Sequence, residues 1–132
     1  MDFSTAQSLV AVAKSEADKT GVSVSIAVLD AAAHLLAFAR SEAAALGTID
    51  VSQRKARTAA LFQTDSSELG AGVGPGGPAY TFENTNGGLI VFGGGVVLRN
   101  KDGAFIGAIG IAGATIEQDE AIAKAAASSI LA

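Results

Sequence analysis

The residues best suited to chemistry in this chain are four consecutive polar side chains, Glu83 to Asn86, which are followed directly by Gly87 and Gly88. A carboxylate held beside an apolar segment can act as a general base, and amides can orient a carbonyl or a carboxylate. The glycines let the backbone bend and come close to a ligand. We therefore predict a ligand site that includes Glu83, Asn84, Asn86, Gly87 and Gly88. The alternative is a loop in which the asparagines adopt left-handed turn conformations and Glu83 caps or pairs locally.

Two further side chains are candidates for the same site. Lys55 interrupts an otherwise apolar helical stripe, so we predict that it steadies a developing negative charge. The alternative for Lys55 is an ion pair, or a surface lysine whose methylenes cover the core. His34 is the only histidine and therefore the only imidazole donor. With one histidine and no cysteine, no metal site is expected.

Length and charge limit the class of protein. A chain of 132 residues is large enough for one domain with its own core, and no linker divides residues 1–132. The formal net charge of −4 and scattered basic residues argue against a nucleic-acid partner. The longest apolar stretch is too short to span a bilayer, and the start of the chain does not read as a signal peptide. We therefore expect a cytoplasmic protein with no membrane partner.

The composition also indicates assembly. Hydrophobic residues make up 49% of the chain, and the mean hydropathy of +0.41 is high for a small domain. Monomers seldom expose large contiguous apolar patches, so part of this surface is expected to lie against other copies of the chain. The sequence therefore predicts a homo-oligomer.

The hydrophobic pattern predicts an α+β domain. Period-3.6 patterns indicate a first helix capped by Ser4 and Gln7, a second over Thr48–Phe62, and a last one opened by Thr115 and Gln118. Alternating β-branched segments predict five strands, at Val22–Asp30, His34–Arg40, Leu89–Phe92, Val96–Arg99 and Ala104–Ala112. Mostly hairpin-linked strands form an antiparallel sheet, which helices can cover on both faces. Residues 74–87 are predicted to be irregular.

Several segments in order carry a family resemblance: VSVSIAVLDAAAHLLAFAR, IDVSQRKARTAALF, PGGPAYTFENTNGGLIVFGGGVVLRNKDGAFIGAIGIAGA and EQDEAIAKA. From about Asp2 to Ala132 the chain resembles the GlcG/HbpS family, whose domain also forms the C-terminal part of PduO-type cobalamin adenosyltransferases. The resemblance implies a profilin-like fold and homo-oligomers. It also makes haem a candidate cofactor, because some members bind or degrade haem. Other members accompany glycolate or diol catabolism genes and have no settled activity.

Two departures from the family pattern bear on haem. The turn that usually reads Asp-Ala-Gly-Gly-His ends here as AAAH, which stiffens the approach to His34. Where haem-binding relatives can carry a hydroxyl residue, this chain has Gly87 and Gly88. His34 is then the only strong axial donor, and we expect haem binding that is weak.

Three functions remain open at this stage. The first is a small-molecule-binding domain that can take haem. The second is a cofactor-independent isomerase, tautomerase or lyase for a small oxygenated acid, in which Glu83 moves a proton and Lys55 or an asparagine steadies the oxyanion. The third is a chaperone-like or structural partner of a larger enzyme.

Overall fold

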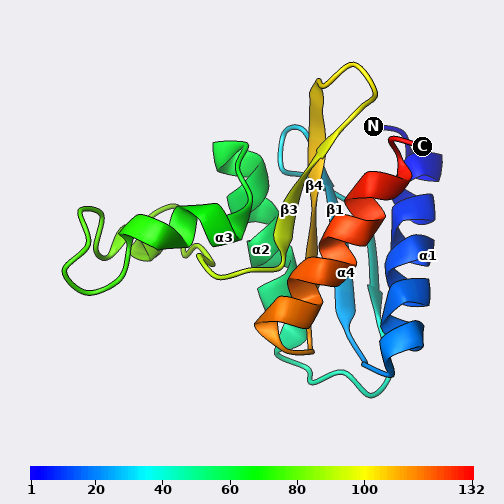
Figure 1. Cartoon of the computed structure of the whole chain (residues 1–132), viewed down its shortest axis with the longest axis horizontal. Coiled ribbons are helices and arrows are strands. Elements are labelled where there is room, and N and C mark those ends of the chain that lie inside the picture. Colours follow the sequence, from blue (N-terminus) through cyan, green and yellow to red (C-terminus); the bar gives the residue numbers. More distant parts are fainter.

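The helices of this protein pack on a small antiparallel sheet, as Figure 1 shows. The computed structural model describes all residues, 1–132. The long helices are α1 (Phe3–Thr20), α2 (Thr48–Phe62) and α4 (Ile116–Ser129), and α3 (Ser66–Leu69) is a single turn. The strands are β1 (Ser25–Asp30), β2 (Leu35–Arg40), β3 (Gly95–Arg99) and β4 (Phe105–Ala112). Two short 3-10 turns, η1 (Gly70–Gly72) and η2 (Phe82–Asn84), lie between α3 and β3.

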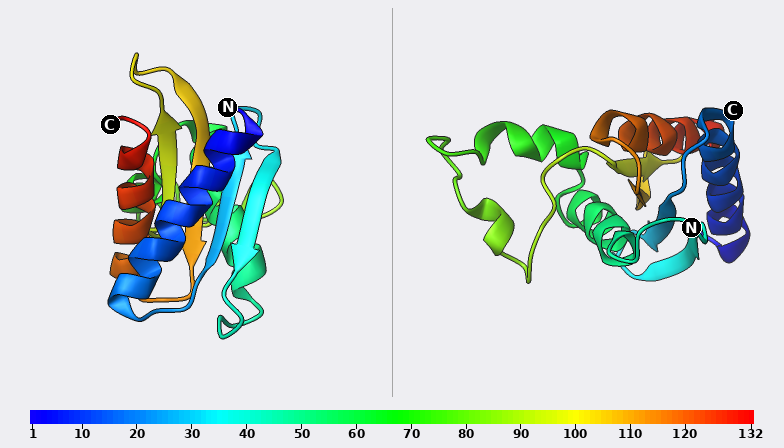
Figure 2. Two further views of the ribbon diagram at one scale, coloured as in Figure 1. Left: turned by 90° about the vertical axis from the view of Figure 1, so that its right-hand side faces the viewer. Right: turned by 90° about the horizontal axis from the view of Figure 1, so that it is seen from below.

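The sheet has the strand order β2-β1-β4-β3, and every neighbouring pair is antiparallel. Helices α1 and α4 lie side by side on one face, and α2 covers the other (Figure 2). This arrangement confirms the predicted α+β class and the placement of helices on both faces. The likeness to profilin stays an expectation.

The predicted fifth strand is wrong: the sheet has four strands, and Leu89–Phe92 belongs to none of them. The N–H of Leu89 donates to the carbonyl of Glu83, and the N–H of Ile90 donates to the Thr58 hydroxyl. Glycines with positive φ flank the segment, Gly88 at 108° and Gly94 at 124°, and turn it out of the sheet. The segment therefore lies against α2 as irregular chain, because its hydrogen-bond partners were decided by packing and not by strand propensity.

The helix ends agree with the sequence in part. Thr115 and Gln118 form the predicted capping box at the start of α4. At α1 the predicted Ser4 cap is wrong, because Asp2 is the N-cap and its carboxylate accepts from the N–H of Thr5. Gly21 ends α1 in the left-handed conformation, which glycine adopts without strain.

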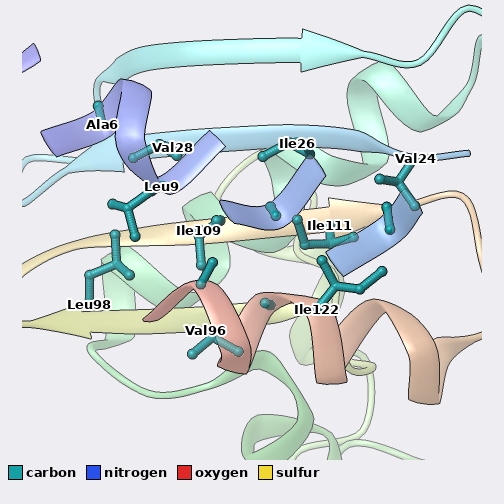
Figure 3. Packing of buried hydrophobic residues seen from close by; sticks show 14 residues of the cluster. Ala6, Leu9, Val24, Ile26, Val28, Val96, Leu98, Ile109, Ile111 and Ile122 are labelled. Carbon is teal, nitrogen blue, oxygen red and sulfur yellow. The ribbon is translucent and has the colours of Figure 1, made fainter. Parts of the chain in front are cut away.

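The larger core fills the space between the sheet and the pair α1 and α4. Figure 3 shows its packing, in which Leu9 of α1 and Ile122 of α4 meet Ile109 and Ile111 of β4. The opposite face is built from smaller side chains, mainly alanines of α2, β1 and β4. A Cβ at Gly110 would overlap the Ser52 carbonyl of α2, so this glycine lets α2 lie close to the sheet. Close packing of α2 fixes the position of its outer side, which carries the polar residues described below.

None of the helices combines the length and the apolar character that a membrane span requires.

Candidate functional site

The loop of residues 81–88 is fastened to α2 at two points. At one end, the Phe82 ring meets Phe62 edge to face, with ring centroids 5.0 Å apart. At the other end, Arg57 Nη1 donates to the Asn86 carbonyl at 2.6 Å, and Arg54 Nη1 donates to the Gly87 carbonyl at 2.7 Å. The polar loop singled out in the sequence therefore has a defined place beside the second helix.

The backbone of this loop is bent through left-handed residues. Asn86, Gly87 and Gly88 have φ values of 54°, 75° and 108°. A Cβ on Gly88 would come within 2.5 Å of Arg54 Nη1, which also donates to the Gly88 carbonyl at 3.1 Å. Glycine at position 88 thus permits both the turn and the close approach of the guanidinium.

A polar depression lies between the loop and α2. Its volume is about 370 Å³, it is open to solvent, and no apolar side chain lines it. The lining residues are Asp50, Gln53, Arg54, Arg57, Asn86 and Gly87. Of the predicted ligand residues, the structure brings only Asn86 and Gly87 to this depression.

Glu83 and Asn84 belong to the short turn η2. Asn84 is exposed, whereas Glu83 is half-buried and its Oε2 is buried without a hydrogen-bond partner. A buried carboxylate oxygen with no donor is costly, so Glu83 has capacity to accept a hydrogen bond from a group outside the folded chain. The turn interpretation also has support, because Asn86 is left-handed and its amide donates to the neighbouring Thr85 hydroxyl at 3.1 Å.

Lys55 lies inside the fold. Its side chain is 1% exposed, and its Nζ donates to Asp119 Oδ2 at 2.9 Å and to the Ile111 carbonyl at 2.8 Å. The third face of the ammonium lies 5.1 Å from the centroid of the Phe92 ring. Asp119 is also occupied, since its Oδ1 accepts from the N–H of Ala114 at 3.0 Å. The ammonium therefore links α2 to α4 and is not presented to the polar depression.

His34 occupies the turn between β1 and β2. Its side chain is 80% exposed, with Nδ1 3.9 Å from Asp30 Oδ2. The N–H of His34 donates to Asp30 Oδ1 and, as the main cause, holds the pKa of that carboxyl below its ordinary value of 3.8. Nδ1 is therefore the ring nitrogen on the side of Asp30, and most of the ring is exposed to solvent.

An apolar groove lies between α1 and β2. Phe3, Val10 and Ala11 of α1 form one wall with Gln7, and Leu36, Ala37 and Phe38 of β2 form the other. The groove has a volume of about 420 Å³, and its β2 wall starts two residues beyond His34. It lies at the edge of the sheet, because β2 is the outermost strand.

The structure therefore divides the predicted site among three places. His34 lies at a hairpin turn, Lys55 lies in the core, and the residues from Glu83 to Gly88 lie on the loop beside α2. Sequence reasoning missed Arg54 and Arg57, which hold that loop. Their spacing of three residues on a predicted helix was the available signal, because such residues share one face.

No group of three or more histidine, cysteine or acidic side chains is arranged to hold a metal ion.

Comparison with known proteins shows the family to which the chain belongs. Residues 1–128 match the family described as "Haem degrading protein HbpS-like". The chain belongs to this HbpS-like family. It is similar to the protein GlcG of Escherichia coli (strain K12), with 41% identity over 106 residues that cover 80% of this chain and 76% of GlcG. It is 33% identical to the corrinoid adenosyltransferase PduO of Salmonella typhimurium, but spans only 39% of that protein.

Two solved structures are closely similar in fold to this chain. The crystal structure of Klebsiella pneumoniae protein ORFY has a TM-score of 0.96 and 30% identity, and the match covers all of this chain and 91% of that one. The crystal structure of a PduOC–haem complex has a TM-score of 0.92 and 33% identity, covering 98% of this chain and 94% of that one.

The position of Lys55 leads to a stability prediction. Lys55→Met and Asp119→Asn should each lower the free energy of unfolding by about 3–5 kcal/mol, because each leaves a buried polar partner without its counter-charge. Lys19→Met is the matched control, since the Lys19–Glu16 pair is largely exposed and should contribute less than about 0.5 kcal/mol. Urea unfolding of the three variants measures both effects. An unchanged midpoint in Lys55→Met would contradict the structural role.

Proposed function

We propose that this protein is a cytoplasmic, homo-oligomeric small-molecule-binding domain and that haem is its ligand. The observation that carries the proposal is the similarity to the PduOC–haem complex along nearly the whole chain. His34 is the proposed axial ligand, because it is the only imidazole and its ring is exposed.

The residues around His34 suit a flat, largely apolar ligand. The ring is 80% exposed, and the apolar groove between α1 and β2 begins two residues further along the chain, at Leu36. A neutral imidazole is a common axial ligand of haem iron, and apolar walls limit the access of water to a bound macrocycle. When bound, haem would supply redox or oxygen chemistry, while the chain would supply the imidazole and the apolar surface.

Titration with haemin tests this proposal. The parent protein should produce a shifted Soret band that saturates, with weak affinity, at one haem per chain, and His34→Ala should weaken binding further, by roughly tenfold or more, because the axial nitrogen is lost. Lys101→Ala, on an exposed turn of the hairpin between β3 and β4, is the control and should bind like the parent. A parent protein with no shifted band, or a His34→Ala variant with unchanged affinity, would refute haem ligation by this residue.

Homo-oligomerisation is supported by large apolar side chains left at the surface. They include Phe3 of α1, Leu35 of β2 and Leu46, which are 59%, 49% and 71% exposed. The edge strand β2 also has one side without a partner strand. Covering such surface is the usual result of assembly.

Light scattering at micromolar concentration measures the assembly. We expect a mass at least twice the 13.0 kDa of one chain, because association would remove these side chains from water. A mass of one chain at this concentration would exclude a stable oligomer.

The second candidate function is proton transfer on a small oxygenated acid, without an organic cofactor. The observation that favours it is the Oε2 atom of Glu83, in the loop of residues 81–88, which is buried and has no hydrogen-bond partner. In this proposal Glu83 takes a proton from the carbon next to a carbonyl group, the electron pair of the broken C–H bond forms a C=C bond, and the carbonyl π pair moves to its oxygen. Return of a proton from Glu83 to carbon reverses these changes and restores the carboxylate. Asn84 and Asn86 orient the substrate, and Gly87 and Gly88 allow its approach. Lys55 contributes through the scaffold, since its ammonium is engaged by Asp119.

Deuterium incorporation tests this second function. A panel of small 2-oxo acids in D₂O should exchange the hydrogens on C3 faster with the parent protein than without protein. Glu83→Gln should abolish that acceleration and leave stability within about 1 kcal/mol, because the amide keeps the size of the side chain. Glu68→Gln, at an exposed position of α3, is the control. Exchange that survives in Glu83→Gln would exclude this residue as the base, and loss of stability with unchanged exchange would indicate a local structural role.

A further inference from the structure

The side of α2 that faces solvent carries two guanidinium groups whose hydrogen-bonding capacity is only partly used. Arg57 donates through Nη1 to the Asn86 carbonyl at 2.6 Å, and its Nε and Nη2 have no protein acceptor. Arg54 uses Nε for Asp50 at 2.7 Å and Nη1 for the loop carbonyls, and its Nη2 has no protein acceptor. A guanidinium has five N–H donors in a planar fork that matches a carboxylate.

The two side chains are also held in position before any ligand arrives. Both are half-buried, and both are tethered to backbone carbonyls of residues 86–88. Gly88 leaves room for Arg54 to reach those carbonyls. Preorganised donors lose less conformational entropy on binding than free surface arginines would.

The local charge is opposite to that of the whole protein. The depression of about 370 Å³ is lined by two arginines and one aspartate, Asp50, which gives a formal local charge of +1 on a chain whose net charge is −4. Its remaining lining groups, Gln53, Asn86 and Gly87, are polar or small. An apolar ligand has no apolar surface to contact here, whereas an anion can bind to positively charged hydrogen-bond donors.

We propose that Arg54 and Arg57, together with the loop of residues 86–88, form a binding site for a carboxylate group. The inference rests on the second proposed function, because it names the residues that bind the carboxylate of the acid. These residues lie on α2, beside the loop that carries Glu83. The carboxylate can belong to a small organic acid or to a larger ligand such as haem, and the experiment distinguishes these sources.

Malonate, a small dicarboxylate, is the probe, and uncharged malonamide of similar shape is its control. Melting temperature and calorimetric titration are measured at constant ionic strength, balanced with chloride. Malonate should raise the melting temperature of the parent protein saturably, and malonamide should not. Absence of a saturable malonate effect, or an equal effect of malonamide, would overturn the proposal.

Variants of the two arginines locate the site. Arg57→Gln and Arg54→Gln should each reduce malonate affinity by roughly tenfold, since charge-assisted bonds to the carboxylate are lost. Arg57→Lys keeps the charge without the planar fork and should be intermediate. Arg99→Gln, at the end of β3, is the control and should bind like the parent. Equal affinity in Arg57→Gln and Arg99→Gln would place any malonate binding elsewhere and refute the site.

Two further measurements are needed. The first distinguishes a carboxylate-binding site from arginines that only hold the loop in place, and the second distinguishes a small acid from haem as the source of the carboxylate. If the arginines only hold the loop, Arg57→Gln should lower the melting temperature without ligand, and malonate should have no effect on the parent protein. That pair of results would contradict the proposal. Preloading with haemin should leave malonate binding intact if the acid is a separate ligand, and should block it if haem carboxylates occupy the site. Malonate binding without deuterium exchange would keep the carboxylate site and exclude only the proton-transfer function.

Discussion

The buried ion pair between Lys55 and Asp119 is the contact on which the arrangement of the other elements depends. It joins α2, on one face of the sheet, to α4, on the other, beside the ends of β3 and β4. The side chains are 1% and 4% exposed, so neither charge can turn to water if its partner is lost. The local backbone is adapted to this pair, because a Cβ on Gly94 would come within 2.6 Å of the ammonium. Glycine at position 94 therefore makes room for the lysine as well as allowing the turn before β3.

Helix α2 connects this internal contact to the surface loop. Lys55 points from it into the core, while Arg54 and Arg57, three residues apart on the same helix, point to the loop of residues 86–88. The small side chains beneath α2 let the helix lie close to the sheet, and the ion pair ties it across the sheet to α4. The arginines are therefore carried by a helix whose position is fixed by packing, and such support is needed to hold a polar loop in one geometry. The large apolar core on the other face supplies stability and has no direct contact with this loop.

The sequence predicted much of the fold because its local signals were strong. The helix periods over the three long helices and the capping box at Thr115 both correspond to structure. The failure at Leu89–Phe92 has a physical reason, since strand propensity measures how well a side chain suits a half-buried pleated surface and α2 supplies such a surface without a ladder. Nothing local in this segment indicates that its N–H groups would bond to Thr58 and Glu83.

The candidate site was harder to predict, because a lysine on an apolar stripe has the same appearance whether it serves a ligand or an ion pair. The deciding partner, Asp119, is 64 residues away and stands among other acidic residues at the start of α4, where an acid also suits the helix dipole. His34 and the polar loop both looked reactive, but the sequence could not show that a hairpin and a helix would carry them to different parts of the surface. Residue type identified groups capable of chemistry, and only the packing of α2 decided which of them can meet one ligand. In this protein, then, the two groups lie on different elements: the imidazole is on the turn between β1 and β2, and the pair of arginines is on α2 beside the polar loop.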